Sequence, residues 1–256
     1  MFNYNDFMSR NWMFIDSSVQ KKIKKTKLLF TGCGLGSFIA ELALRSGFED
    51  VTLADDDKVE LSNLNRQNYD ISNINVSKVE ALSSRLKSIN PKAKIKIINK
   101  RISDASELGK AIEKSDIIIN TFDINDVYFD LIKIASENKI ITILPFNVGF
   151  GSFVLALDSV NCGDFIKNYG NSKSDLELLL NLFHISKKDK IKLPDYININ
   201  LNQIIKQIDK IKINPQVGIA SFITSSIVCS MMINYLESGK INSFPNFNYI
   251  DFKDKI

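Results

Sequence analysis

The side chains best suited to chemistry lie in one polar stretch in the first third of the chain. Three aspartates, Asp55 to Asp57, are followed by the segment Ser62-Asn63-Leu64-Asn65-Arg66-Gln67. An aspartate at a strand end can bind a ribose, and an arginine can bind phosphates and neutralise charge that develops during phosphoryl or adenylyl transfer. Because one ribose needs only one acid, the additional polar groups indicate chemistry at phosphates. The alternative is an acidic surface turn with a solvated salt bridge to Arg66.

A glycine-rich turn precedes the aspartates. Its glycines are Gly32, Gly34 and Gly36. The turn separates an apolar run starting at Leu28 from a helical pattern, and a second apolar run, Val51 to Ala54, ends beside Asp55. This order predicts a strand, a turn, a helix and a strand, with glycines that let a phosphate approach the helix start. The motif is irregular, since Ser37 replaces the last glycine of G-x-G-x-x-G, and the glycines could instead only allow close packing of strand against helix.

Two charged residues farther along occupy positions that a nucleotide could reach. Lys78 lies in the first turn of the amphipathic helix predicted for Val76 to Ile89, where the helix dipole does not favour a cation and an anionic partner is expected. Asp123 follows the apolar run from Asp116 to Asn120, which is typical of a strand buried in a parallel sheet. A carboxylate beyond such a strand end can hold Mg²⁺. The alternatives are an exposed surface lysine and an aspartate that caps the next helix.

Together, the glycine turn, the aspartates and the arginine segment resemble the ThiF/MoeB/HesA family, the prokaryotic relatives of ubiquitin-activating enzymes. The resemblance extends roughly from Ser9 to Gly149 and more weakly over the end of the chain. It implies an enzyme that uses ATP and magnesium to adenylate a carboxylate. The carboxylate would be the C-terminus of a small carrier protein or peptide, or a small acid.

The resemblance also implies roles for individual residues. Those expected to bind the nucleotide are Gly32, Gly34, Gly36, Asp55, Asp57, Asn63, Arg66, Gln67 and Lys78, and those expected to act in catalysis are Asp123, Arg66, Lys78 and Arg10. Asp123 would hold the metal. Arg10 would reach the nucleotide site of the other subunit of a homodimer, although a local cap or ion pair would explain it equally well. The chain departs from the family at Ile124, where an asparagine is usual, and at Tyr128, where an arginine is common.

The fold predicted from these patterns is a doubly wound, Rossmann-like α/β domain. Its mostly parallel sheet is expected to continue into C-terminal antiparallel strands, and a long helix is predicted from Val217 to Leu236. We expect one domain, with an N-terminal arm at 1–26, a nucleotide-binding core at 27–158 and a crossover segment with a helical part at 159–256. Helical patches are also predicted at Leu176 to Phe183 and Leu201 to Ile211, and Pro145 to Gly151 is predicted to be a loop over the site.

Composition narrows the class of protein. The net charge of +4 comes from dispersed lysines, and the run Lys21 to Lys25 is expected to be a solvated face, so no nucleic-acid partner is predicted. Cys33, Cys162 and Cys229 are isolated, which favours a reducing cytoplasm and argues against a zinc site. A thiol nucleophile at Cys162 stays open but lacks a base, and His184 is expected to be structural. No secretion signal or membrane span is expected, because Ser, Thr and Asn interrupt the apolar helix at 217–236.

Two other functions remain possible. A non-catalytic nucleotide-binding scaffold would accommodate the irregular glycine turn, Ile124 and Tyr128. An NAD-dependent oxidoreductase would share the fold, but it would leave Arg66, Lys78 and Asp123 without a common role.

Overall fold

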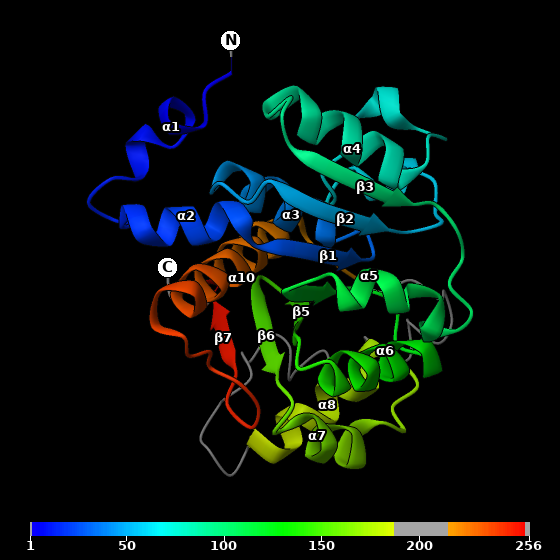
Figure 1. Ribbon diagram of the computed structural model, residues 1–256. Helices are drawn as coiled ribbons and strands as arrows, with labels where there is room; N and C mark the ends of the chain where they lie inside the picture. Colours follow the sequence, from blue (N-terminus) through cyan, green and yellow to red (C-terminus); the bar gives the residue numbers. More distant parts are fainter. Residues whose placement is uncertain (1, 187–214, 254–256) are drawn as a thin grey trace.

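A computed structural model describes residues 2–186 and 215–253 as a central sheet covered by helices on both faces (Figure 1). The strands are β1 (Lys27–Thr31), β2 (Asp50–Ala54), β3 (Lys94–Ile98), β4 (Ile117–Asn120), β5 (Ile141–Val148), β6 (Gly151–Leu157) and β7 (Asn248–Asp251). They form one seven-stranded sheet in the order β3-β2-β1-β4-β5-β6-β7. The first five strands pair in parallel, and β6 pairs antiparallel with both β5 and β7. The predicted fold class is therefore confirmed.

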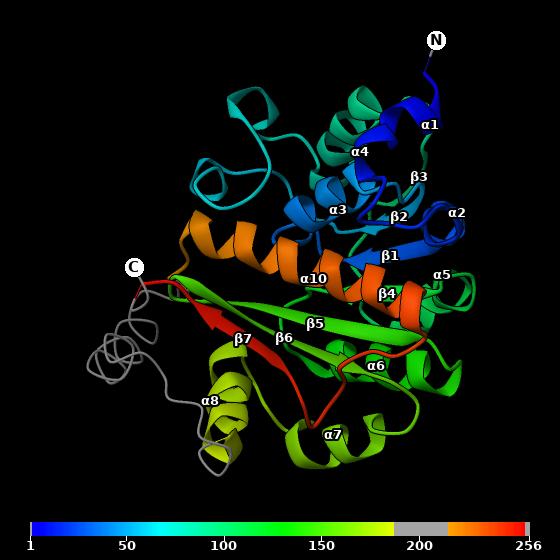
Figure 2. The ribbon, with the colours of Figure 1, turned by 90° about the vertical axis from the view of Figure 1, so that its left-hand side faces the viewer.

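The helices are divided between the two faces (Figures 1 and 2). One face carries α2 (Ser17–Lys25), α3 (Gly36–Arg45), α4 (Lys78–Ile89) and α10 (Gly218–Ser238), and the other carries α5 (Gly109–Glu113), α6 (Asp126–Glu137), α7 (Cys162–Tyr169) and α8 (Asp175–Ser186). An N-terminal arm contains α1 (Tyr4–Phe7) and the 3-10 turn η1 (Ser9–Asn11), and further 3-10 turns are η2 (Leu61–Asn63), η3 (Ile71–Asn73) and η4 (Ala105–Leu108). Because both faces are covered, β4 is buried along its whole length, as its apolar run predicts.

The loop predicted at Pro145 to Gly151 is wrong for its first half. β5 continues through Pro145 to Val148 and turns directly into β6. A proline cannot donate a ladder hydrogen bond, but β4 pairs with β5 only as far as Ile143. Pro145 therefore faces only β6, where it lies opposite Val154. The sequence pattern did not predict α7 either, whereas α8 agrees with its predicted patch. The predicted helix at Leu201 to Ile211 and the side chain of His184 lie outside the described residues.

Among the described helices, α10 is long and apolar enough to cross a membrane by length and composition. It packs along α3, β5 and β6 (Figure 2). Its buried side chains include Val228, Cys229 and Met232. Such a helix is typical of the core of a water-exposed domain as well as of a membrane span. Its packing against the sheet favours the core helix.

The strand order fixes where a ligand would bind. β1 lies between β2 and β4 in the sheet. The connection that leaves β1 leads to β2 on one side, whereas the connection that leaves β4 leads to β5 on the other side. In open parallel sheets, ligands bind at the carboxyl ends of the strands where this reversal occurs. The arrowheads of β1, β2 and β3 point to that edge, on the right of Figure 1.

Candidate functional site

The glycine turn follows β1 and contacts the end of β4, at the point where the strand order reverses. Gly32 has φ +96°, and its carbonyl oxygen accepts a hydrogen bond of 2.9 Å from Thr121 Oγ1 at the end of β4. A Cβ at Gly32 would lie 2.6 Å from the Thr121 carbonyl oxygen. Gly34 and Gly36 complete the turn, and Gly36 begins α3. Gly32 thus serves close packing, the simpler of the two predicted roles.

Asp55 holds this turn from the end of β2. Its carboxylate accepts hydrogen bonds from the backbone N–H groups of Cys33 (2.6 Å) and Asp57 (2.8 Å). The side chain is buried, and burial raises the pKa of Asp55 although the charge of Lys78 and the two amides oppose the shift. Because each carboxylate oxygen can accept more than one hydrogen bond, contact with a ribose remains compatible with this arrangement.

Lys78 is buried rather than exposed, so the surface-lysine alternative is wrong. Its Nζ lies 2.7 Å from Asp57 Oδ2, and its backbone N–H donates to the Asp57 carbonyl. The Lys78 side chain is 8% exposed, whereas that of Asp57 is 65% exposed. The start of α4 therefore holds a cation beside the glycine turn, with a partner that can move into solvent. Asp56 and Asp57 lie close enough to Asp55 to hold a cation by geometry, but the lysine and the backbone amides already engage this group.

Arg66 lies in a short segment that folds back over the site. Its Nη1 donates to Ser62 O (2.6 Å) and Asn65 Oδ1 (3.0 Å). Its Nε is buried and has no hydrogen-bond partner among the described residues. No ion pair joins Arg66 to the aspartates in the described part of the chain, so the alternative of a salt bridge between them is wrong.

Gln67 and Asn63, on either side of Arg66 in the sequence, are buried. Gln67 lies over the turn, with its Nε2 3.1 Å from a Cβ placed on Gly34, and its Oε1 lacks a partner in the described chain. Asn63 uses its side-chain oxygen to accept the Glu60 backbone N–H at 3.1 Å. A buried arginine nitrogen and a buried amide oxygen without partners are the groups that a bound polar ligand would satisfy.

Asp123 projects from the loop after β4 and is exposed. The cap of α6 is Asn125, whose side chain accepts the Tyr128 N–H, so the capping alternative for Asp123 is wrong. Asp175, in the first turn of α8, accepts a backbone hydrogen bond from Ile124. Burial and the charge of Asp123 raise the pKa of Asp175 to about 6. Two neighbouring carboxylates are donors that Mg²⁺ prefers, so the residues present fit this metal.

Sequence reasoning missed Asp175 and Thr121. Asp175 lies about fifty residues after Asp123 in a stretch of weak periodicity, and a helix start after Ser174 is its only local signal. Thr121 could have been found as the hydroxyl residue that directly follows a buried strand.

The two departures from the family pattern both point into the core. Tyr128 is 1% exposed and Ile124 is 6% exposed, and both join an aromatic cluster under β5 and β6. The Tyr128 hydroxyl has no hydrogen-bond partner in the described chain. Cys162 is buried beside Ile132, and burial raises the pKa of its thiol, which does not favour a nucleophile.

Arg10 does not join the other candidates within the chain. The arm that carries it packs near the amino ends of the strands, where the Tyr4 hydroxyl donates to Gly47 O at 3.0 Å. Arg10 is exposed and forms no ion pair with the described residues, so the local pair is not seen. A role in another subunit remains a prediction.

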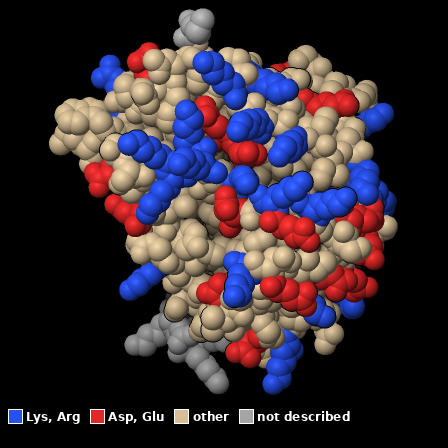
Figure 3. Space-filling view, viewed as in Figure 1, with Lys and Arg blue, Asp and Glu red and all other residues tan. Residues whose placement is uncertain are grey.

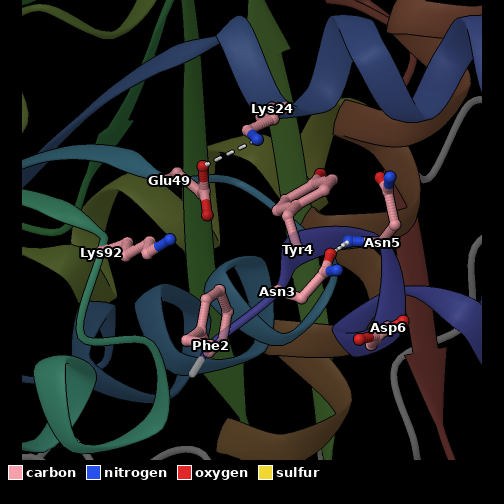
Figure 4. A pocket seen from close by; sticks show the side chains of 8 residues that line it. All are labelled: Phe2, Asn3, Tyr4, Asn5, Asp6, Lys24, Glu49 and Lys92. Atoms are coloured by element: carbon pink, nitrogen blue, oxygen red, sulfur yellow. Dashed lines mark hydrogen bonds and ion pairs between the residues drawn. The ribbon is translucent and has the colours of Figure 1, made fainter.

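A hollow of about 490 Å³ lies beneath this arm (Figure 4). Its lining includes Phe2, Tyr4, Lys24, Glu49 and Lys92. Glu49 immediately precedes β2, so the hollow lies at the edge of the sheet opposite to the glycine turn. It is therefore separate from the candidate site.

The surface charge is mixed. Lysines gather over α2, and acidic side chains are interspersed across the visible face (Figure 3). The lysines of the 21–25 run are exposed while Ile23 is buried, which confirms the predicted solvated face.

Comparison with known proteins identifies a protein family and individual relatives. The model of the ThiF family matches residues 8–250. The molybdopterin-synthase adenylyltransferase of Haemophilus influenzae is 35% identical over 111 residues, which cover 43% of this chain and 45% of that protein. Ubiquitin-like modifier-activating enzyme 5 of Caenorhabditis elegans is 29% identical over 135 residues, covering 53% of this chain and 31% of the relative. The chain thus matches less than half the length of these two relatives.

Solved structures share the architecture. E. coli MccB, crystallised with ATP, superposes with a TM-score of 0.64 at 18% identity, covering 96% of this chain and 71% of MccB. At this identity the likeness shows the fold alone.

Proposed function

Because the chain belongs to the ThiF family, we propose that it is an ATP-dependent adenylyltransferase that activates a carboxylate. A carboxylate oxygen attacks the α-phosphorus of ATP, and the bond from that phosphorus to the bridging oxygen of pyrophosphate breaks. The products are an acyl-adenylate and pyrophosphate. Such chemistry needs positioning and charge stabilisation more than a protein nucleophile, in accord with three buried cysteines.

One observation carries this proposal. Arg66 Nε is buried beside the glycine turn without a partner in the described chain. A guanidinium nitrogen so placed stabilises folding little by itself, but it can donate to a phosphate oxygen. Lys78 lies at the start of the next helix and supplies a second cation that can leave Asp57 for a phosphate. Gly34 and Gln67 would contact the same nucleotide, and Asp55 its ribose.

Magnesium belongs to the same proposal. Asp123 would hold the ion and Asp175 would supply a second carboxylate from α8. The bound ion would stabilise the charge of the leaving pyrophosphate.

The carboxylate of the substrate would enter the site from the side formed by β5 and β6. The names of the relatives support a small carrier protein, a ubiquitin-like protein or a peptide as the substrate. E. coli MccB was also crystallised with MccA and AMPCPP. A small acid is a further candidate.

A second copy of the chain would complete the site with Arg10. Next to Arg10, Trp12, Met13 and Phe14 are exposed by 70%, 81% and 89%. Consecutive exposed apolar side chains mark an interaction surface, and docking of this arm on another protomer would cover them. Mixing inactive Arg10→Ala and Asp123→Asn proteins tests this, because a mixed dimer has one site with both residues intact. Recovery of activity supports the proposal, and inactivity of a verified mixed dimer refutes it.

Calorimetric titration with ATP and magnesium tests the function. We expect ATP binding to weaken in Arg66→Ala and to lose its magnesium dependence in Asp123→Asn. The matched controls are Arg101→Ala and Asp126→Asn, which change exposed residues of the same types. Exchange of labelled pyrophosphate into ATP, with carrier peptides and small acids as acceptors, then identifies the substrate.

Two outcomes would replace this proposal. Tight ATP binding without pyrophosphate exchange for any acceptor would favour a nucleotide-binding scaffold. The buried Tyr128 is the observation that suggests this alternative. Binding of NAD in place of ATP would indicate an oxidoreductase.

A further inference from the structure

The first turns of α10 hold the backbone of the arginine segment. Ser221 Oγ donates a hydrogen bond of 2.9 Å to the carbonyl oxygen of Arg66. One turn earlier, a Cβ at Gly218 would lie 2.5 Å from the carbonyl oxygen of Asn65, so only glycine allows the helix to approach this closely. Asn65 Nδ2 also lies 3.4 Å from Gln216 O. α10, about 150 residues later in the sequence, therefore holds the backbone of Arg66 in place.

The contact continues to the β5–β6 hairpin. Asn147, near the end of β5, donates from Nδ2 to Ser221 Oγ at 2.9 Å and accepts at Oδ1 from Thr224 Oγ1 at 2.8 Å. The donors run in one direction, from Thr224 through Asn147 and Ser221 to the Arg66 carbonyl. Ser221 and Thr224 are completely buried. Buried hydroxyls without partners are costly, so each link depends on the next.

Arg66 needs an external support. Among the described residues, its side chain bonds only to Ser62 and Asn65, which belong to its own segment. These bonds shape the segment but do not place it against the glycine turn. The placement comes from other elements, on one side through the Asn68 N–H to Ser37 Oγ (2.9 Å) and on the other through Ser221.

We propose that Ser221 is a positioning residue for Arg66, and that Asn147 extends this support to the hairpin that borders the substrate side. The inference rests on the proposed function, because it assumes that Arg66 binds the phosphates of ATP. Movement of the β5–β6 hairpin would then change the position of the arginine.

A double-mutant cycle tests the inference with ATP and magnesium as the probe. We expect Ser221→Ala to weaken ATP binding roughly three- to tenfold, as for the loss of one buried hydrogen bond. In the Arg66→Ala background, the same substitution should change the affinity less than about twofold, because Ser221 acts through Arg66. The matched control is Ser225→Ala, one turn later on α10. Ser225 is also buried, but within the described part of the chain its hydroxyl bonds only to Ser221 O of its own helix.

Asn147→Leu gives a second measurement that leaves the Ser221 hydroxyl in place. We expect a smaller loss of ATP affinity, which also disappears when Arg66 is alanine. If Ser221→Ala does not fold, as judged by thermal unfolding, the Asn147 cycle decides. Equal affinities for Ser221→Ala and Ser225→Ala, or losses that add to that of Arg66→Ala, would overturn the inference. An unmodified protein that does not bind ATP, or binding indifferent to Arg66→Ala, would instead overturn the proposed function.

Discussion

The two sides of the candidate site are built from different chemistry. On the β1–β2 side, polar groups form directed contacts, as in the hydrogen bond of the buried Asp55 with the Cys33 N–H and the ion pair of the buried Lys78 with the exposed Asp57. On the β4–β5 side, the loop that carries Asp123 rests on an aromatic cluster that includes Tyr128, Phe153 and Phe165. The first side can fix a nucleotide by directed hydrogen bonds, whereas the second offers a shape and two carboxylates. Under the proposed function, nucleotide binding would depend on the first side and substrate choice on the second.

Gly32→Ala should have the largest effect on stability and ATP binding, because Gly32 lies where the two sides of the site meet. A Cβ would lie 2.6 Å from the Thr121 backbone, and alanine disfavours a φ of +96°. We expect a loss of about 3 kcal/mol or more in the free energy of unfolding, together with loss of ATP binding. Urea unfolding measures the first and calorimetry the second. Gly109→Ala is the control, since a Cβ there meets nothing within 4 Å, and stability equal to that of the control would show that the junction is not tight.

The first side was predicted well because its signals are local. The glycine turn, the aspartates and Arg66 lie within 35 positions of one another, and strand ends in parallel sheets meet at one edge. What the sequence could not show is that Asp57 already holds Lys78, or that Ser221 supports Arg66. Those contacts depend on how α4 and α10 pack, and packing partners far apart in sequence leave no local pattern.

Asp175→Asn tests whether the second side binds metal with two carboxylates. We expect magnesium to bind ATP-loaded protein roughly tenfold more weakly, because one charged ligand is lost while the shape is kept. Asp123→Asn should cost more. Manganese titration followed by electron paramagnetic resonance measures the affinity without requiring turnover, and Asp164→Asn is an exposed control. Unchanged affinity would assign Asp175 to the support of the Ile124 backbone alone.

The second side was predicted less well for a physical reason. Asp123 was located from the buried strand before it, but α7 and the continuation of β5 through Pro145 were not. α7 is held by side chains such as Phe165 that pack on Phe244, about eighty positions away. Tertiary contacts of this kind override weak local periodicity.

Tyr128→Phe tests whether Tyr128, which stands where the family commonly has an arginine, has only a structural role. Its hydroxyl is buried without a partner in the described chain, so its removal should stabilise the protein by about 1 kcal/mol. ATP affinity should not change, because the side chain lies in the aromatic cluster. Thermal unfolding and calorimetry provide the two values. A clear loss of stability would show that the hydroxyl is bonded, and a loss of ATP affinity would place Tyr128 in the site.

The smallest expected effect concerns Glu41, which anchors the polar side through pH-sensitive contacts. Its carboxylate bonds to Arg85, to Asn68 Nδ2 at 2.6 Å and to Arg45 at 2.8 Å. Burial alone would raise the pKa of Glu41, but these hydrogen bonds outweigh it and lower the pKa below its ordinary value of 4.5. Because the folded protein binds this proton less readily than the unfolded chain, the stabilisation is complete above about pH 4.5 and is lost as the pH falls through the folded pKa.

Glu41→Gln should therefore lower the free energy of unfolding at pH 7 by at most about 1 kcal/mol, since its partners are partly exposed. In urea unfolding, the difference from the unmodified protein should shrink as the pH falls through the lowered pKa of Glu41, because the carboxylate is then protonated in both folded and unfolded chains. Glu237→Gln, an exposed position on α10, should give no such pH-dependent difference. A Glu41→Gln difference that stays constant from pH 7 to pH 3 would mean that shape, and not charge, holds Asn68 and the arginine segment against α3. The two sides of the site would then differ less in chemistry than their contacts indicate.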